Sequence, residues 1–284
     1  MNPTVAIIAQ GAMGAGVGAR LVERGLRVVT SLSGRSSASA QRAQAAGMIA
    51  VSDEECVQAD FFLSICPPSD AMALAQKMAA LIARGSSTSG KKPIYVDCNA
   101  VSPPSKVKIG EVILQSGAAF VDIGITGLPP KPGHSPNLHA SGPDAAKVGV
   151  LNDFGIKVNV INGPVGAASA LKMSYAGITK GTTALGSMMM LAATRAGVGE
   201  LLRSELERSH GALVAQFQRA IPDMFDKAYR FDGEMLEIAD FVSEDKQAQQ
   251  MYHAISEFYT RIAADHAGKR EETGALAAFV KKKD

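Results

Sequence analysis

Residues 5–14 read VAIIAQGAMG, and this stretch decides the fold. Its first five residues are apolar, as in a strand that is buried on both faces. Gly11, Ala12 and Gly14 follow, and apolar residues then recur at helical spacing until Gly25. A dinucleotide-binding turn needs small residues at this place, because the backbone must approach a pyrophosphate that N–H groups at the helix start bind. The stretch therefore predicts a nucleotide-binding turn, with an ordinary tight strand–helix turn as the alternative.

Short apolar strands and amphipathic helices alternate through the first half of the chain. Strands separated by helices of this length imply βαβ units and a mainly parallel sheet. The expected strands after the first span residues 27–32, 60–65, 93–97, 118–125, 137–141 and 156–161. Helices are expected over residues 37–46 and 69–84, and another opens at residue 102. Together these elements predict an α/β Rossmann domain.

The second half of the chain has a different pattern, because helix-forming residues dominate it from about Gly166 onward. One apolar stripe predicts a helix of about 30 residues or slightly less. The stripe consists of Leu171, Tyr175, Ile178, Leu185, Met189 and Ala192. Further helices are expected over residues 199–211, 212–228, 232–241 and 246–264. We therefore predict a Rossmann domain over residues 1–163 and an all-α domain over residues 164–284.

Composition excludes several classes of protein. The 284 residues carry 29 Lys and Arg against 27 Asp and Glu, so no excess positive charge attracts nucleic acid or anionic lipid. Cys56, Cys66 and Cys98 are an odd set without metal-ligand spacing, as for reduced thiols in the cytosol. The start of the sequence has no basic segment, and its apolar run is far shorter than the roughly 20 residues of a membrane helix. We expect a cytoplasmic protein with no metal, membrane or nucleic-acid partner.

The turn after the second expected strand favours one form of cofactor. Enzymes that bind NAD place Asp or Glu there, about 20 residues beyond the glycines, to bind the ribose 2′-hydroxyl. Residues 30–36 read TSLSGRS and contain no acid. Arg35 can donate paired hydrogen bonds to a 2′-phosphate, and Ser33 and Ser36 can add hydroxyl donors. This turn predicts NADP (NADPH), with a plain surface arginine as the alternative.

Several motifs resemble those of the β-hydroxyacid dehydrogenase and 6-phosphogluconate dehydrogenase family. The family's opening G-x-G-x-M-G is similar to residues 9–14, with Ala9 in place of the first glycine and with Met13 retained. The prolines that follow its fourth strand are similar to residues 66–68, which read CPP. Its D-x-(S/N)-x-x-x-P segment matches residues 97–103, with Asn99 at the polar position.

The resemblance continues into the second half of the chain. The substrate loop D-A-P-V-S-G-G is similar to residues 122–128, and the catalytic helix G-x-G-x-x-x-K-x-x-N-N is similar to residues 166–176. Arg230 lies in a C-terminal segment that resembles a less characterised subgroup with a phosphogluconate-dehydrogenase-like domain. Three departures stand out: Tyr175 and Ala176 replace the two asparagines, Thr126 and Leu128 replace a serine and a glycine, and the turn before Arg35 is longer.

The resemblance implies an NADP-dependent dehydrogenase or reductase acting on CH–OH. Hydride passes between the nicotinamide and a small β-hydroxy acid or related alcohol or carbonyl, and Lys172 is the general acid/base. The ordinary pKa of lysine, about 10.4, is high for a base, but desolvation and the positive nicotinamide ring both favour the neutral amine. A lysine that merely extends beside an apolar stripe is the structural alternative.

The other expected site residues fall into two sets. The cofactor set comprises Gly11, Ala12, Met13, Gly14, Ser33, Arg35, Ser36, Cys66, Pro67, Pro68 and Asn99. The substrate set comprises Thr126, Gly127, Lys180 and Arg230, which are expected to bind an acidic substrate. Tyr175 is expected to be catalytic with Lys172 by sharing proton transfer, with a place in the apolar core as the alternative. A solvated face for Lys180 and an Arg230–Glu234 helix pair are the alternatives. His139 is expected to be structural.

The resemblance also implies an active site between the domains and a homodimer formed by the C-terminal helices. Two other functions stay open. One is an imine or enamine reductase of the same architecture, which fits the loss of asparagine at Ala176, although retention of Lys172 argues mildly against it. The other is a non-catalytic NADP-binding module. A methyl-transferring Rossmann enzyme would need an acid at the end of the second strand, and residues 30–36 contain none.

Overall fold

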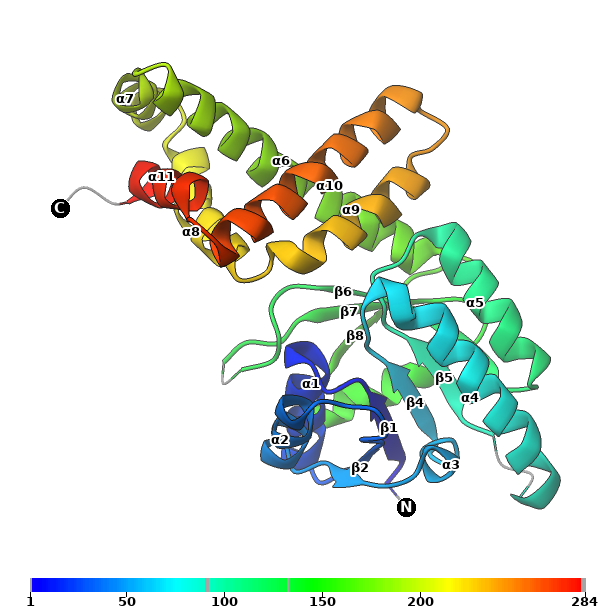
Figure 1. Cartoon of the computed structure of the whole chain (residues 1–284). Coiled ribbons are helices and arrows are strands. Elements are labelled where there is room, and N and C mark those ends of the chain that lie inside the picture. The colour runs from blue at the N-terminus through cyan, green and yellow to red at the C-terminus, as the bar shows by residue number, and fades with distance from the viewer. Residues whose placement is uncertain (1, 90–91, 132, 282–284) are drawn as a thin grey trace. The chain divides into compact units, whose positions relative to one another are not determined.

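The computed structural model describes residues 2–89, 92–131 and 133–281 (Figure 1). Contacts within the chain divide it into two compact units, residues 1–173 (unit 1) and residues 174–284 (unit 2). The division falls within the long helix α6 (Ala167–Arg195), whereas the boundary expected at residue 163 precedes that helix.

Unit 1 is built on an eight-stranded sheet with the order β3-β2-β1-β4-β5-β6-β7-β8. Its strands are β1 (Thr4–Ile8), β2 (Arg27–Thr30), β3 (Ile49–Ala50), β4 (Phe61–Ser64), β5 (Ile94–Asp97), β6 (Ala119–Thr126), β7 (Asn137–Ser141) and β8 (Lys157–Val160). Strands β1 to β6 are parallel, β7 runs antiparallel to β6, and β8 is parallel to β7. The order 3-2-1-4-5-6 is that of a dinucleotide-binding fold, in which ligands bind where the order reverses, between β1 and β4.

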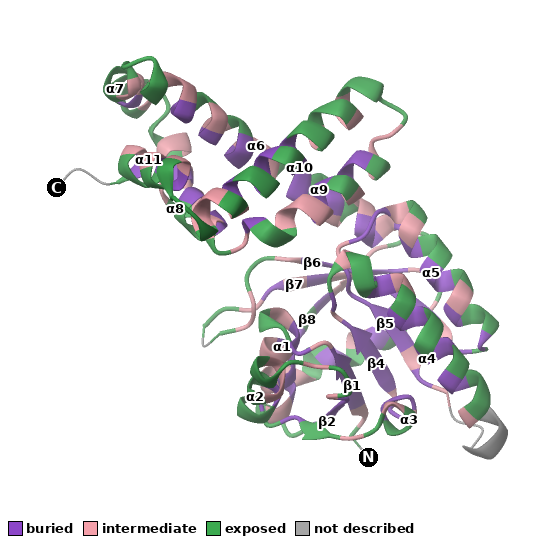
Figure 2. Cartoon of the chain, viewed as in Figure 1, coloured by how far each residue is buried: buried purple, intermediate pink, exposed green. Residues whose placement is uncertain are grey.

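Two apolar layers cover the sheet (Figure 2). The helices are α1 (Ala12–Glu23), α2 (Ser37–Ala45), α3 (Asp53–Cys56), α4 (Pro68–Ser89), α5 (Pro103–Gln115) and the 3₁₀ helix η1 (Ala145–Phe154). Val5 and Ile7 of β1 pack with α1, α2 and η1, whereas Ala6 and Ile8 pack with α3, α4 and α5. Each strand thus buries both faces, which explains its nearly continuous apolar sequence.

Unit 1 contains three elements that the sequence analysis did not identify. Strand β3 has only two residues, both exposed, so it carries no apolar signal. Helix α3 has four residues and begins with a capping box between Ser52 and Glu55. The residues of η1 show almost no helical periodicity, because a 3₁₀ helix repeats every three residues. Short elements leave too few positions for a period to appear.

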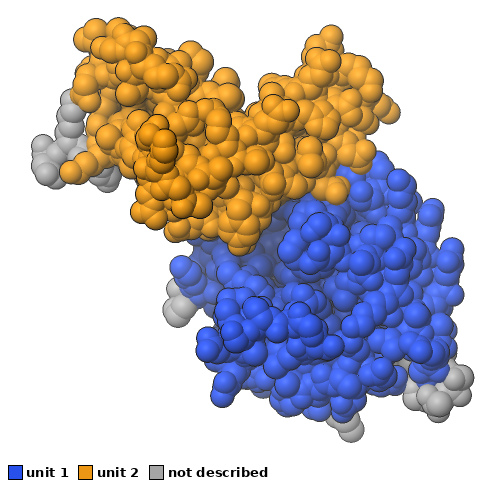
Figure 3. Space-filling view, viewed as in Figure 1, with its two compact units in different colours: residues 1–173 blue, residues 174–284 orange. Residues whose placement is uncertain are grey.

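Unit 2 is helical, and its atoms are drawn in orange in Figure 3. It contains the rest of α6, with α7 (Gly199–Ser209), α8 (Gly211–Phe225), α9 (Ala228–Phe241), α10 (Lys246–Ala267) and α11 (Glu271–Val280). Helix α11 was not expected from the sequence, and Asp265 holds its start by accepting backbone hydrogen bonds from Glu271, Glu272 and Thr273. Within the described residues, no helix is both long and apolar enough to cross a bilayer. A mainly parallel Rossmann-type domain followed by a helical region confirms the predicted fold class.

The apolar stripe of α6 lies on the open side of that helix. Leu171, Tyr175, Ile178, Leu185 and Met189 are between 43% and 70% exposed in the single chain. The buried face instead carries Ala168, Ser169, Met173, Ala176, Thr183, Ala184, Ser187, Met190 and Leu191, most of which are small. Small residues allow neighbouring elements to approach α6 closely. The periodicity therefore identified the helix, but the stripe has no cover within one chain.

Candidate active site

The turn between β1 and α1 has the geometry that a pyrophosphate needs. Gly11 precedes α1 in extended backbone, and among the described residues no side chain caps the helix. A Cβ atom at Gly11 would meet nothing within 4 Å in the described structure, so the space above it is open. A Cβ atom at Gly14 would lie 2.0 Å from the carbonyl oxygen of Ala9, so only glycine allows this packing. Uncapped N–H groups beside open space fit the predicted cofactor turn.

Gln10 of this turn and Arg42 of α2 also shape the site, and no sequence pattern predicted them. The buried amide of Gln10 donates to the Ser31 carbonyl at 3.0 Å and to the Thr30 hydroxyl, which joins the ends of β1 and β2. The Arg42 guanidinium donates to the Gln10 carbonyl at 2.7 Å. It thereby adds positive charge at this edge of the sheet. In the sequence, Arg42 is indistinguishable from any exposed helix arginine.

The loop after β2 holds the expected 2′-phosphate residues. Gly34 has a φ of +68°, and the Arg35 N–H closes the turn on the Leu32 carbonyl at 3.0 Å. Ser33 is exposed and Arg35 is half-buried. The Ser36 hydroxyl accepts a hydrogen bond from the Ser39 N–H and so caps α2. Ser36 thus has a structural task at the place where it was expected to bind phosphate.

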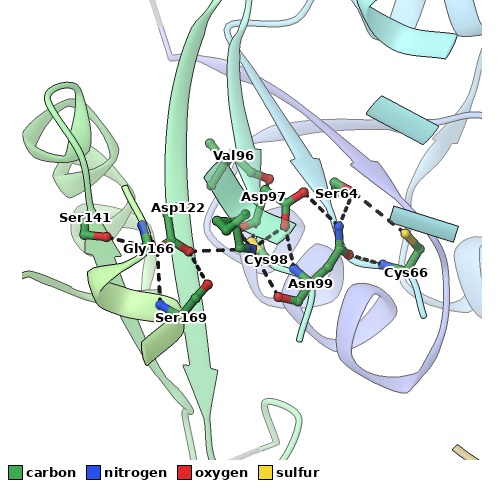
Figure 4. Close-up of polar contacts among 11 residues, drawn as sticks. Ser64, Cys66, Val96, Asp97, Cys98, Asn99, Asp122, Ser141, Gly166 and Ser169 are labelled. Carbon is green, nitrogen blue, oxygen red and sulfur yellow. Dashed lines mark hydrogen bonds and ion pairs between the residues drawn. The ribbon is translucent and has the colours of Figure 1, made fainter. Parts of the chain in front are cut away.

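Asn99 acts as a clamp between the ends of β4 and β5. Its side-chain oxygen accepts from the Cys66 N–H at 2.7 Å, and its nitrogen donates to Ser64 and Asp97 at 2.8 and 3.0 Å (Figure 4). These bonds engage both ends of the amide inside the protein. Asn99 therefore holds the loop that carries Cys66, Pro67 and Pro68. Burial, aided by the Asp97 charge, raises the pKa of the Cys66 thiol to about 12, so this thiol stays neutral.

A fully buried lysine lies beyond this clamp. The Lys106 ammonium donates to the carbonyl oxygens of Asp97 and Asn99, each at 3.1 Å, and to the Asp97 carboxylate. It also lies 3.5 Å from a carboxylate oxygen of Asp122. Burial alone would lower the pKa of Lys106, but the charges of Asp97 and Asp122 outweigh it, and the pKa is raised. Lys106 is therefore a permanent cation that links α5 to β5 and β6.

Asp122 connects Lys106 to the start of α6. Its carboxylate accepts from the N–H groups of Gly166 and Ser169 at 2.9 and 3.1 Å (Figure 4). It also accepts from the hydroxyls of Ser169 and Ser141 at 2.7 and 3.0 Å. A carboxylate at a helix N-terminus is favourable, because it meets unpaired N–H groups and the positive end of the helix dipole. The first turn of α6 is thus anchored to β6, directly before Lys172.

Lys172 lies against β6 where that strand has no side chain. A Cβ atom at Gly124 would lie 2.4 Å from the Ala168 carbonyl oxygen and 3.0 Å from the Cβ of Lys172. Thr126 shares this face of β6, because alternate residues of a strand point the same way. His139 lies directly opposite Gly124 on β7, and its Nε2 atom is 3.3 Å from the Thr126 hydroxyl. Lys172, Thr126 and His139 therefore gather around Gly124.

His139 belongs to this group although it was expected to be only structural. Burial and then the charge of Lys157 lower its pKa, so the imidazole is neutral at neutral pH. A neutral imidazole can either donate to or accept from the Thr126 hydroxyl. The sequence alone could not predict the contact between His139 and Thr126, because it depends on the register in which β7 pairs with β6.

The loop after β6 connects this group to the cofactor turn. Gly127 has a φ of +109°, which favours glycine and turns the chain out of the strand. Pro130 lies against Gly16 of α1, where a Cβ atom would come within 3.0 Å of the proline ring. The Arg20 guanidinium donates to the Lys131 carbonyl at 3.0 Å. The loop that carries Thr126 and Gly127 is thus fastened to helix α1.

The remaining expected site residues lie in unit 2. Tyr175 follows Lys172 by one turn of α6 and is half exposed. The Lys180 ammonium forms an ion pair with Glu234 and lies 4.5 Å from the centre of the Phe231 ring. Its side chain is 18% exposed and its charge is balanced by Glu234, so Lys180 does not lie on a solvated face. Arg230 is exposed on α9. Throughout the described ranges, no cluster of three or more His, Cys, Asp and Glu residues is arranged to hold a metal.

Comparisons with known proteins agree with this geometry. One family model, the NADP oxidoreductase coenzyme F420-dependent family, matches residues 4–100, and a domain of unknown function, DUF1932, matches residues 193–262. An uncharacterised 28.5 kDa protein of Methanothermus fervidus is 28% identical over 221 residues, which cover 76% of this chain and 82% of that protein.

Solved structures extend the likeness to nearly the whole chain. A conserved protein of unknown function that is structurally similar to 3-hydroxyacid dehydrogenases has 28% identity and a TM-score of 0.69, over 95% of this chain and 99% of its own. The 3-hydroxyisobutyrate dehydrogenase of Mycobacterium tuberculosis shares the fold with a TM-score of 0.73 and 17% identity, over 98% and 99% of the two chains. An imine reductase of Myxococcus stipitatus shares it with a TM-score of 0.59 and 16% identity, over 98% and 100%.

The motifs, the sheet order, the cofactor turn and these matches point the same way. Together they show that the chain has the architecture of NAD(P)-binding oxidoreductases and is similar to proteins of the β-hydroxyacid dehydrogenase-like family.

Proposed function

We propose that this protein is an NADP-dependent oxidoreductase that transfers a hydride between the nicotinamide and a small β-hydroxy acid or related alcohol or carbonyl compound. One observation carries the proposal. Lys172 is held against Gly124 of β6, on the face that also presents Thr126 and His139. A basic amine beside hydroxyl and imidazole groups can handle both the proton and the polar groups of such a substrate.

The cofactor would be held by residues of three loops. The uncapped N–H groups at the start of α1 would bind the pyrophosphate, and Arg35 with Ser33 would bind the 2′-phosphate. The loop over residues 66–68, clamped by Asn99, would lie along the dinucleotide. When bound, the oxidised nicotinamide accepts the hydride.

In our mechanism Lys172 moves the proton. Its neutral amine removes the hydroxyl proton as hydride leaves the same carbon, and in the reverse direction its ammonium protonates the developing alkoxide. Asp122, held by Lys106, would position it by fixing the first turn of α6, and the bonds from Gly166 and Ser169 to Asp122 support this role. Thr126 donates a hydrogen bond to the substrate carboxylate, and the neutral imidazole of His139 orients that hydroxyl.

We further propose that the protein is a homodimer. Five large apolar residues line the open side of α6, and a second copy of the same face would cover them. A two-fold axis makes such a surface self-complementary. The macromolecular partner is therefore a second copy of this chain. The proposed substrate is a small molecule that bears a carboxylate. The free, buried thiols of Cys56, Cys66 and Cys98 support a cytoplasmic location, where thiols stay reduced.

Reduction of a C=N bond is the second candidate function. Ala176, where the family motif has asparagine, is buried and apolar, so that position offers no amide to hold a hydroxy acid. The likeness to an imine reductase fold makes the alternative specific. A non-catalytic NADP-binding module is the third reading, and it assigns no proton transfer to Lys172.

A substrate panel with a Lys172→Met variant tests these proposals. The purified protein with NADP⁺ should oxidise at least one small β-hydroxy acid, and the variant should lose about 100-fold or more in turnover, as for loss of a positioned acid–base group. NADPH binding, measured by calorimetry, should be nearly unchanged in the variant. Oxidation of amines in place of hydroxy acids would favour the imine reductase. NADPH binding without turnover of either hydroxy acids or amines would favour the non-catalytic NADP-binding module.

A further inference from the structure

Asp53 brings a carboxylate to the end of β2 from a neighbouring part of the sheet. Strand β3 pairs with β2 so that Ala50 lies beside Thr30, and the Val51 N–H donates to the Thr30 carbonyl at 2.9 Å. Helix α3 begins at Asp53, directly after this pairing. The loop after β2 contains no acid of its own, but the fold supplies one beside it.

The surroundings of Asp53 keep its carboxylate charged. The side chain is 14% exposed, and one of its oxygens lies 2.5 Å from the Lys77 ammonium. Burial would raise the pKa of Asp53, but hydrogen bonds from Lys77 and Ser31, together with the charges of Lys77 and Arg35, outweigh it and lower the pKa. Arg35 and Asp53 are thus opposite charges that act on one another at the end of β2.

A cavity of about 510 Å³ opens between the two segments. Residues 31–33, from the loop after β2, line one part of it, and residues 50–54, from β3 and the start of α3, line the other. In dinucleotide-binding folds the adenosine ribose lies at the end of the second strand, where a carboxylate favours a 2′-hydroxyl and an arginine favours a 2′-phosphate. Here Asp53 lines the cavity, and Arg35 follows the lining residue Ser33 by two positions in the loop after β2.

We propose that Asp53 sets the preference between the two nicotinamide cofactors, by accepting a hydrogen bond from the 2′-hydroxyl of NAD(H) and repelling the 2′-phosphate of NADP(H). Arg35 acts in the opposite sense, and the ion pair with Lys77 offsets part of the repulsion. The inference rests on the proposed cofactor binding and adds to it the residue pair that determines selectivity. It also gives Lys77 a role in binding without requiring that Lys77 touch the cofactor.

Cofactor binding by two variants with opposite expected effects tests the proposal. Dissociation constants for NADPH and NADH are measured by calorimetry on the full-length protein. Asp53→Asn should bind NADPH about fivefold to tenfold more tightly and NADH more weakly by a similar factor, the scale of one charge-assisted hydrogen bond. Lys77→Met removes the ammonium that pairs with the Asp53 carboxylate. This variant should therefore bind NADPH more weakly and NADH more tightly than the wild-type protein.

Glu54→Gln provides the matched control. Glu54 lines the same cavity one residue further on, is exposed, and loses the same charge in the variant. The dissociation constants of the Glu54→Gln variant for NADPH and for NADH should each change by less than about twofold, because exposed charges are strongly screened. Thermal unfolding of each variant confirms that it is folded before binding is measured.

Several outcomes separate this inference from the proposed function. Equal changes for both cofactors in Asp53→Asn, or a Glu54→Gln variant that reproduces its effect, would overturn the role of Asp53 while leaving catalysis untouched. The predicted opposite shifts in a protein that turns over no substrate would support the role of Asp53 and remove the proposed reaction. Failure of the wild-type protein to bind either cofactor would overturn both.

Discussion

Strand β1 of unit 1 and the apolar stripe of α6, most of which belongs to unit 2, differ in whether the chain buries their apolar residues. In unit 1, Val5, Ile7 and Ile8 of β1 are almost completely buried between two layers of helices. In unit 2, the apolar stripe of α6 is exposed, while small residues such as Ala176 and Ala184 form its buried face. Apolar periodicity therefore identifies a helix or strand, but it does not say whether the same chain covers it.

The two units also differ in how a carboxylate holds the start of a helix. Asp122 is fully buried and anchors α6 with bonds from Gly166 and Ser169. Asp265 lies near the surface and anchors α11 with bonds from Glu271 and Thr273. The number of bonds is similar, so burial should decide how much each one contributes to stability.

Replacing these two aspartates tests the comparison with the largest expected effect. Asp122→Ala strands several buried donors and removes one partner of Lys106, so it should lower the free energy of unfolding by about 3–5 kcal/mol. Asp265→Ala should cost only about 1–2 kcal/mol, because the helix start at Glu271 is exposed and water can replace part of the lost hydrogen bonds. Urea unfolding of both variants measures the difference. Equal losses would show that burial does not distinguish the two anchors.

Two glycines should respond to alanine with opposite signs. Gly124→Ala would push a Cβ atom into the Ala168 carbonyl oxygen, so it should destabilise the protein by about 1–3 kcal/mol and displace Lys172. Gly233 lies in α9, and nothing described lies within 4 Å of where its Cβ would be. Gly233→Ala should stabilise the protein by about 0.5–1 kcal/mol, since alanine favours helix. Unfolding curves, with turnover for the first variant, report both effects; stabilisation by Gly124→Ala would contradict the close packing.

A polar substitution in the exposed apolar stripe of α6 should weaken the proposed dimer. Leu185→Asn should raise the dissociation constant of the proposed dimer by at least about 10-fold, because each interface would then lose two buried leucines. Leu114 of α5 in unit 1 is exposed to a similar degree and serves as the control, so Leu114→Asn should leave assembly unchanged. Sedimentation over a range of concentrations measures both. A wild-type protein that stays monomeric at every concentration would exclude the dimer.

A smaller effect on binding is expected at the proposed cofactor loop of unit 1. Arg35→Ala should weaken NADPH binding by about fivefold to tenfold and leave NADH binding nearly unchanged, because only the 2′-phosphate is lost as a partner. Arg27, at the other end of β2, is exposed and provides the control, so Arg27→Ala should alter neither constant. Calorimetry with both cofactors decides. Equal losses for NADPH and NADH in Arg35→Ala would show that Arg35 does not recognise the phosphate.

Local sequence signals were sufficient for the fold class, and they predicted in which turns and loops several candidate site residues lie. Gly11 and Gly14 lie where the motif predicted, and Arg35 lies in the loop after β2. Asn99 was placed in the right loop, but its amide is used as a clamp between β4 and β5. A motif indicates that a residue type is needed at a position. It does not indicate which atoms the side chain will meet.

The sequence alone determined the alternation of strands and helices, the nucleotide-binding turn and the change to helices near residue 166, because each depends on residues that are close along the chain. Only the tertiary structure decided that His139 lies beside Thr126, that Asp53 lies beside the loop after β2, and that the stripe of α6 is left open. These features depend on strand order, pairing register and packing. These features bring together residues that are far apart in the sequence, so no local sequence pattern predicts them.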